Sequence, residues 1–195
     1  MALGFLGLPW ESTVLRYDDE ATPIQLTGKK MLPIARIDGE AMNESLDIIK
    51  RLDPQNKLQH QRAGELDATL NELGSLVHSL AMPYWVWTPE FDETSRTYFI
   101  KKKSTKRGPF TELAKRRTEF EAPILELLKR LEPQLSLYWN SNTLTIQDIT
   151  LAAHVWGLFV VPEFRFSEKW HDYLMRVKAD CKFEYHHDFW EQPWS

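Results

Sequence analysis

Apolar residues recur at steps of three and four from about residue 61 onward, and this period restricts the fold more than any other feature. Five of them fall on one face of a single long helix: Leu66, Leu70, Leu73, Val77 and Leu80. The same period returns between Phe110 and Leu131, where Pro123 predicts a kink. Further helices are expected to begin near Thr145 and Ser167. This part of the chain is therefore predicted to be all-helical.

The preceding part of the chain carries shorter and more mixed signals. Residues 12–17 are rich in β-branched and aromatic side chains and predict a strand. Residues 33–37 predict a second strand, which begins at a proline. Asp38-Gly39 then gives a strong hairpin signal, so residues 41–42 are expected to form the return strand.

These two patterns define the expected domain organisation. Asn43 is predicted to cap a short amphipathic helix that closes a small α/β domain over residues 1–53. A linker follows at residues 54–60, and an all-helical domain at residues 61–195. The fold class is thus α/β plus all-α, and 195 residues are enough for both parts without disulfide bonds.

Charge and hydropathy exclude several classes of protein. The formal net charge is −4, so nucleic acid is not an expected partner. The basic cluster at Lys101–Lys103, Lys106 and Arg107 is interpreted as a solvated helix end. No apolar run approaches the roughly 18 residues that a membrane span requires. We predict a cytoplasmic protein without a membrane partner.

Nucleophile and metal motifs are scarce in this sequence. Its single cysteine, Cys181, is interpreted as a small buried apolar residue rather than a nucleophile. His186-His187-Asp188 has no recognised ligand spacing, so no metal site is predicted there. Phosphate-binding loops and nucleophile elbows are absent from the sequence.

Several segments in a fixed order resemble the two-domain, glutathione-transferase-like glutaredoxins of the glutaredoxin 2 type. Three of them lie in the first part of the chain, at residues 18–23, 28–34 and 43–49. Three more lie in the second part, at residues 98–103, 110–113 and 144–149. This resemblance implies a thioredoxin-like N-terminal domain followed by a helical domain of the glutathione-transferase kind.

The resemblance also implies a glutathione site. A cis Leu32–Pro33 bond would turn the backbone of Leu32 outward, to pair with the cysteinyl backbone of glutathione. Glu44 would accept from the α-ammonium of the γ-glutamyl end, and Ser45 with its helix N-terminus would hold the α-carboxylate. A concave groove is expected to join these residues. Plain capping of the helix, without a ligand, is the alternative for Glu44 and Ser45.

The redox element of a glutaredoxin is missing from the sequence as printed. That element is a first strand followed by Cys-x-x-Cys or Cys-x-x-Ser at a helix N-terminus, where the thiol pKa falls. No catalytic residue is therefore assigned, and the apolar residues 2–6 are compared with the end of the missing helix. We expect an N-terminally truncated sequence lacking about 20 residues, with the sheet open between residues 12–17 and 33–37.

The resulting functional hypothesis is a glutathione-dependent thiol–disulfide oxidoreductase, inactive as printed. Glutathione would be the co-substrate, and protein or small-molecule mixed disulfides the partners. The first alternative is a glutathione transferase, which needs a Ser, Tyr or Cys at the same missing position. The second is a redox-inactive domain that binds glutathione or serves as an interaction domain.

A separate motif, Thr145-x-x-Asp148, is interpreted as structural. It is a capping-box variant, and Leu144 with Ile149 can form a hydrophobic staple around it. Loss of the Asp148 carboxylate is expected to cost about 1 kcal/mol of stability without changing the affinity for glutathione.

Overall fold

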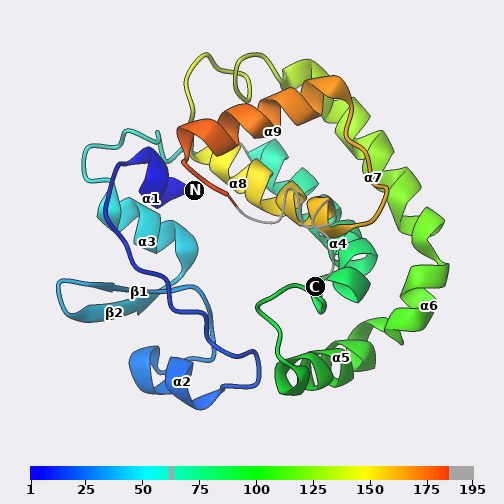
Figure 1. The fold of residues 1–195 in the computed structure, drawn as a ribbon. Helices are drawn as coiled ribbons and strands as arrows, with labels where there is room; N and C mark the ends of the chain where they lie inside the picture. The colour runs from blue at the N-terminus through cyan, green and yellow to red at the C-terminus, as the bar shows by residue number, and fades with distance from the viewer. Residues whose placement is uncertain (62–63, 185–195) are drawn as a thin grey trace.

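The computed structural model describes residues 1–61 and 64–184 of the chain. A small lobe comes first, drawn in blue and cyan in Figure 1. It comprises α1 (Ala2–Phe5), α2 (Ala21–Thr27), β1 (Ile34–Ile37), β2 (Glu40–Asn43) and α3 (Ser45–Leu52). A larger helical lobe follows, with α4 (Gly64–Trp85), α5 (Glu93–Arg107), α6 (Phe110–Lys115), α7 (Arg117–Leu131), η1 (Glu132–Gln134), α8 (Ile146–Val155), η2 (Trp156–Val160) and α9 (Glu168–Asp180).

The predicted hairpin is confirmed. β1 pairs with β2 in antiparallel register from Ile34 opposite Asn43 to Ile37 opposite Glu40. The two turn residues, Asp38 and Gly39, have φ values of 52° and 86°. A two-residue turn of type I′ between antiparallel strands requires positive φ at both positions, and the Asp-Gly pair adopts this geometry readily.

The predicted strand at residues 12–17 is wrong. Residues 8–16 form no regular element, and in the described part of the chain β1 pairs with β2 alone. The segment is instead anchored at its end to α5. The backbone N–H of Tyr17 donates to Ser95 Oγ at 3.1 Å, and Ser95 Oγ donates to Asp18 at 2.8 Å. β-Propensity produces a strand only where a neighbouring strand accepts its hydrogen bonds, which is why the pattern misled.

The short helix α1 is stable because it packs against the helical lobe. Ala2 is buried in the main core, and Gly4 lies against the end of α9. A Cβ atom at Gly4 would lie 1.8 Å from the carbonyl oxygen of Cys181, so only glycine permits this approach. A helix this short would not persist without such contacts.

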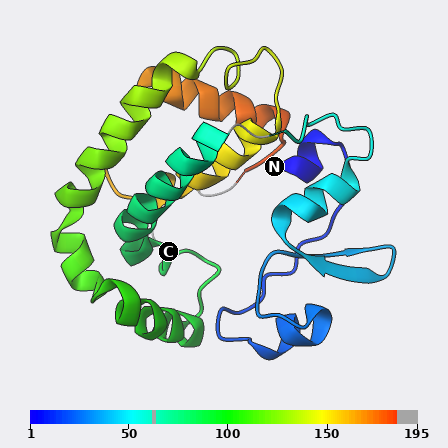
Figure 2. The same cartoon turned by 180° about the vertical axis from the view of Figure 1, so that it is seen from behind.

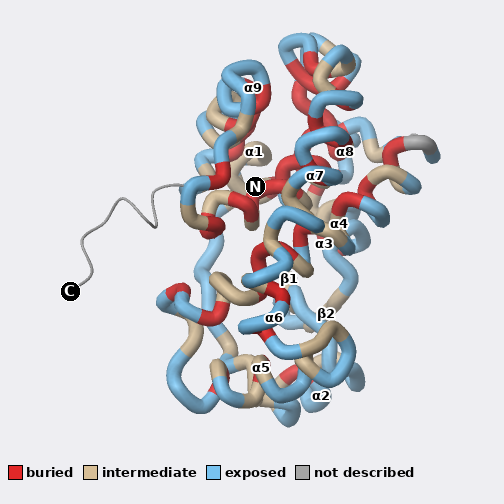
Figure 3. Tube along the Cα trace, turned by 90° about the vertical axis from the view of Figure 1, so that its right-hand side faces the viewer, coloured by how far each residue is buried: buried red, intermediate tan, exposed pale blue. Residues whose placement is uncertain are grey.

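The helical lobe encloses the main core. Figures 1 and 2 show α4 and α8 in the interior of this lobe, with α7 and α9 around them. The five periodic residues of the sequence, Leu66 to Leu80, are all at most 2% exposed, as predicted. Figure 3 shows the buried stripes along α4, α7 and α8. Residues 110–131 form two helices rather than one kinked helix, because α6 ends at Lys115 and α7 begins at Arg117.

A buried carboxylate organises the connection between the two lobes. Asp53 accepts hydrogen bonds from the backbone N–H groups of Lys57 at 2.9 Å and Leu58 at 2.8 Å. Leu58 is fully buried in the helical core, and its carbonyl accepts from the N–H of Ile146 at 2.7 Å. The connecting segment is therefore fixed to the start of α8 rather than loose.

Candidate functional site

The end of the hairpin brings the predicted glutathione residues together. The Leu32–Pro33 peptide bond is cis, as predicted. Because Ile34 lies opposite Asn43, Pro33 and Glu44 are the next residues at the same end of the ladder. Ser45 begins α3 immediately afterwards. The register of one short hairpin thus places all four predicted residues at one edge of the small lobe.

Leu32 has the backbone that the predicted site requires. Its side chain is exposed, with 54% of the residue accessible to solvent. Its N–H and C=O groups form no hydrogen bond with the described residues. A free donor and acceptor on one exposed residue can pair with the backbone of an extended peptide.

The start of α3 differs from the prediction in one respect. Asn43 is the last residue of β2, so Glu44 rather than Asn43 occupies the N-cap position. Asn43 is held by the ladder, and its Nδ2 donates to Thr27 Oγ1 at 3.2 Å. Glu44 has φ 72° and ψ 102°, and no side-chain hydrogen bond caps α3. A glutamate with this backbone is strained by about 1–3 kcal/mol.

This helix start can bind an anion. The Glu44 carbonyl accepts the N–H of Ile48 at 2.9 Å, which leaves the first turn of α3 with N–H groups directed outward. Glu44 and Ser45 are both exposed. Uncapped N–H groups, the positive end of the helix dipole and a hydroxyl together suit a carboxylate, while Glu44 can accept from an ammonium group.

A cluster that the sequence did not predict lies beside this edge and links the two lobes. The Glu20 carboxylate accepts from Lys30 Nζ and from the hydroxyl of Tyr98 on α5. Lys102 Nζ lies 3.4 Å from the same oxygen. The Lys30 and Tyr98 contacts, with a further contribution from Lys102, lower the pKa of Glu20 to about 2. Lys30 is thereby held two residues before Leu32.

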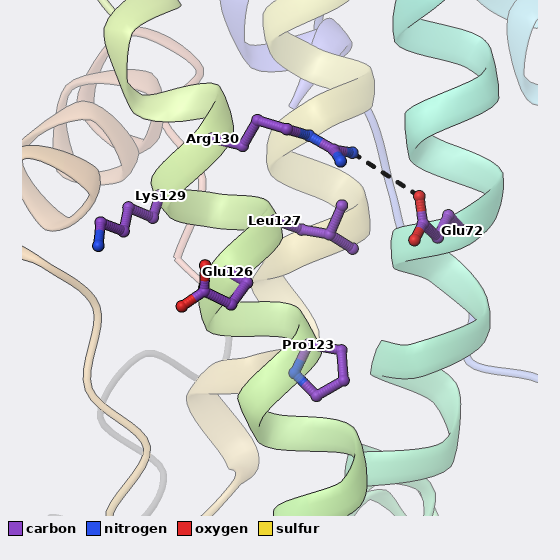
Figure 4. Close-up of a pocket in the computed structure, with 6 residues that line it drawn as sticks. All are labelled: Glu72, Pro123, Glu126, Leu127, Lys129 and Arg130. Carbon is purple, nitrogen blue, oxygen red and sulfur yellow. Dashed lines mark ion pairs between the residues drawn. The ribbon is translucent and has the colours of Figure 1, made fainter.

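A cavity of about 580 Å³ lies elsewhere, between α4 and α7. Figure 4 shows the residues that line it, which are Glu72, Pro123, Glu126, Leu127, Lys129 and Arg130. Arg130 and Glu72 are 3.7 Å apart, and both are exposed. None of the predicted glutathione residues lines this cavity. The predicted groove between Leu32 and Glu44 stays a prediction.

The remaining chemical candidates do not contribute to this site. Cys181 is 1% exposed at the end of α9, and burial raises its pKa to about 12. A thiol with so high a pKa is a poor nucleophile at neutral pH. Within the described residues no group of His, Cys, Asp and Glu side chains could hold a metal ion. The His186-His187-Asp188 segment lies outside the described residues.

Asp148 occupies a structural position, as the sequence predicted. The capping box at the start of α8 is present in full. Both Asp148 oxygens are used: they accept from the N–H of Trp139 at 2.7 Å, the N–H of Thr145 at 2.8 Å and the hydroxyl of Tyr173 at 2.9 Å. Burial raises the pKa of this carboxyl group despite these donors.

The fold defines a class: a small lobe with a hairpin and helix of the thioredoxin type, followed by a helical lobe of the glutathione-transferase type. Two family models match the chain in that order. Residues 1–60 match the glutathione S-transferase N-terminal domain, and residues 65–189 match the glutaredoxin 2 C-terminal domain. The chain belongs to the glutaredoxin 2 family, and the predicted fold class is confirmed.

Individual relatives support this membership. The glutaredoxin 2 proteins of Escherichia coli K12 and O157:H7 are 32% identical to the chain over 121 residues, covering 58% of this chain and 56% of theirs. The chain thus aligns with little more than half the length of these curated relatives. The crystal structure of glutaredoxin 2 from Salmonella typhimurium, solved in complex with glutathione, has a TM-score of 0.86 and 26% identity. That match covers 94% of this chain and 88% of the other.

No helix among the described residues is both long and apolar enough to cross a membrane.

Proposed function

We propose that the chain binds glutathione at the edge formed by Leu32, Pro33, Glu44 and Ser45. The observation that carries this proposal is the free backbone of Leu32, which lies beside an uncapped helix start. The glutathione complex of the Salmonella relative supports the choice of ligand.

Each part of the tripeptide has a complementary group in this proposal. The cysteinyl backbone pairs with the N–H and C=O of Leu32 as a short added strand. The γ-glutamyl carboxylate binds the first turn of α3 and the Ser45 hydroxyl. The Glu44 carboxylate accepts from the α-ammonium group. The strained backbone of Glu44 fits a residue held for binding rather than for stability.

The activity we propose is that of the family, thiol–disulfide exchange with glutathione as co-substrate. Its partners would be protein or small-molecule mixed disulfides, and its location the cytoplasm. Exchange requires a thiolate at the site. The only cysteine in the printed sequence is buried Cys181, so we expect the printed polypeptide to bind glutathione without reducing a mixed disulfide.

The test is a calorimetric titration of the protein with reduced glutathione. Glu44→Gln keeps the shape of the side chain but removes the charge that faces the ammonium, and it should weaken binding about tenfold. Glu72→Gln, which removes an exposed carboxylate from the α4–α7 cavity, is the matched control and should leave the affinity unchanged. Equal affinities for wild type and Glu44→Gln would refute the proposed site.

Cys181→Ser provides a second check on the chemistry. Any slow thiol exchange should be unchanged in this variant, because the native thiol is inaccessible. A residual activity that disappears with Cys181 would make that residue the nucleophile.

A further inference from the structure

Three basic side chains gather where the end of α5 meets α4. Arg107 Nη1 donates to the Ser75 carbonyl at 3.2 Å and to Ser79 Oγ at 2.8 Å. These two α4 residues bracket His78, so the guanidinium group lies against the turn that carries His78. Lys103 is one turn before Arg107 on the same face of α5. His78 itself is exposed.

This basic group continues across the boundary between the lobes. The Lys103 ammonium lies 6.0 Å from the centre of the Tyr17 ring and 5.7 Å from that of Phe99. Lys30 lies 5.8 Å from the centre of the same Tyr17 ring. Lys30, Lys103, Arg107 and His78 therefore form a row, which we call the basic band. It starts two residues from Leu32 and ends on α4.

The far part of the band has no acidic partner. Glu20 pairs with Lys30 at the near end. In the described part of the chain, no carboxylate pairs with Lys103, Arg107 or His78. Partial shielding of the His78 ring from water lowers its pKa, and so do the positive charges of Arg107, Lys103 and His154. His78 is therefore neutral at pH 7, and the charge of this part of the band is that of Lys103 and Arg107. Two neighbouring cations without counter-charge, Lys103 and Arg107, favour an external anion even in a chain of net charge −4.

We propose that the basic band binds an acidic polypeptide segment of the protein whose mixed disulfide the glutathione site accepts. The identity of the partner as a disulfide substrate rests on the proposed function, whereas the affinity of the band for acidic peptide does not. The band runs across both lobes, so it fits an extended chain better than a small anion. Nucleic acid is disfavoured, because Asp18 and Asp19 lie beside Glu20 at the near end and the chain as a whole is acidic.

The experiment compares two peptides that carry glutathione in disulfide linkage to one cysteine. In the first peptide four glutamates follow the cysteine, and in the second four glutamines do. Both are also tested without glutathione, and reduced glutathione is titrated alone. We expect the wild type to bind each acidic peptide about tenfold more tightly than its glutamine counterpart. High salt should reduce this preference strongly, because the charges of the band are at least partly accessible to solvent and are therefore screened.

Matched variants locate the effect. Lys103→Gln with Arg107→Gln should abolish the preference for acidic peptide and leave the affinity for reduced glutathione unchanged. Lys103→Gln alone should reduce the preference if the double variant proves unstable, since only Arg107 bonds to α4. The control is Lys129→Gln with Arg130→Gln, which removes the same charge from α7 and should change nothing.

The outcomes separate the two proposals. Failure of reduced glutathione to bind, with the acidic preference intact in the unmodified peptides, overturns the proposed function and supports the band. Binding of glutathione with equal affinity for both peptides overturns the band alone. An equal loss of preference in the α7 control, or tighter binding of a single-stranded DNA oligonucleotide than of acidic peptide, also overturns it.

Discussion

The starts of α3 and α8 each carry one carboxylate and one hydroxyl side chain, but these groups are exposed at α3 and buried at α8. At α8 the Thr145 hydroxyl and the Asp148 carboxylate satisfy the first N–H groups, and Asp148 is completely buried. At α3 the carboxylate and hydroxyl of Glu44 and Ser45 are exposed, no side chain caps the helix, and Glu44 has φ 72°. The polar groups at the start of α8 are thus paired within the protein, whereas those at the start of α3 are free to bind a ligand.

The comparison teaches that motif chemistry alone does not separate structure from function. Both pairs could be interpreted as caps from the sequence. What distinguishes them is whether the polar groups are already paired, because a carboxylate that accepts several buried hydrogen bonds cannot exchange them for a ligand without loss of stability. Unpaired groups on a strained backbone carry no such penalty.

The largest expected effect is that of Asp148→Ala. The substitution leaves the N–H of Trp139 and the hydroxyl of Tyr173 without their buried acceptor, in addition to removing the cap. Buried unsatisfied donors cost about 1–3 kcal/mol each, so we expect a loss of about 3 kcal/mol rather than the 1 kcal/mol of a cap alone. Urea denaturation measures the free energy of unfolding, and a loss below about 1 kcal/mol would place these donors in contact with water.

Thr145→Ala should have a smaller effect at the same helix start. The hydroxyl accepts the N–H of Gln147 at 3.2 Å and donates to Asp148 at 3.0 Å. Because Asp148 keeps its other donors, we expect a loss of about 1 kcal/mol, measured in the same way. The affinity for glutathione should be unchanged in both α8 variants. Weaker glutathione binding in the folded state of either one would contradict the structural role of this motif.

Glu44→Gly is expected to increase the stability of the protein, in contrast to the two substitutions at α8. Glycine adopts positive φ without a Cβ penalty, which should offset its entropic cost and stabilise the protein by up to about 1 kcal/mol. The same substitution removes the carboxylate and should weaken glutathione binding about tenfold. A thermal melt and a glutathione titration on one sample measure both. A less stable variant with unchanged affinity would show that Glu44 serves α3 rather than a ligand.

The sequence predicted the periodic parts of the fold well. The apolar face of α4, the hairpin at Asp38-Gly39 and the caps at Thr145 and Ser167 all follow from local rules, and the structure has each of them. No helix was predicted at residues 21–27, where the structure has α2, and its Pro23 lies in the first turn, where proline is tolerated.

Interactions between distant residues could not be predicted. The contact of Asp18 with Ser95 and that of Glu20 with Tyr98 join positions 77 and 78 residues apart. Neither residue pair belongs to a motif or a period, so no local rule indicates it. At the proposed site, the family resemblance indicated Pro33 and Ser45 as candidates, but the strained backbone of Glu44 is set by its position between β2 and α3.

Ser45→Ala is expected to have the smallest effect on stability and so gives the sharpest comparison of the two helix starts. The Ser45 hydroxyl is exposed and forms no hydrogen bond with the described residues, and alanine is a better helix former than serine. The free energy of unfolding should therefore change by less than about 0.5 kcal/mol. The affinity for glutathione should nevertheless fall about tenfold, because one hydrogen bond to a charged carboxylate is lost. Ser45→Thr, which keeps the hydroxyl, should restore most of that affinity. A loss of stability comparable to that of Thr145→Ala, with no change in the glutathione titration, would make Ser45 a cap of the same kind as Thr145 and would remove the distinction between α3 and α8.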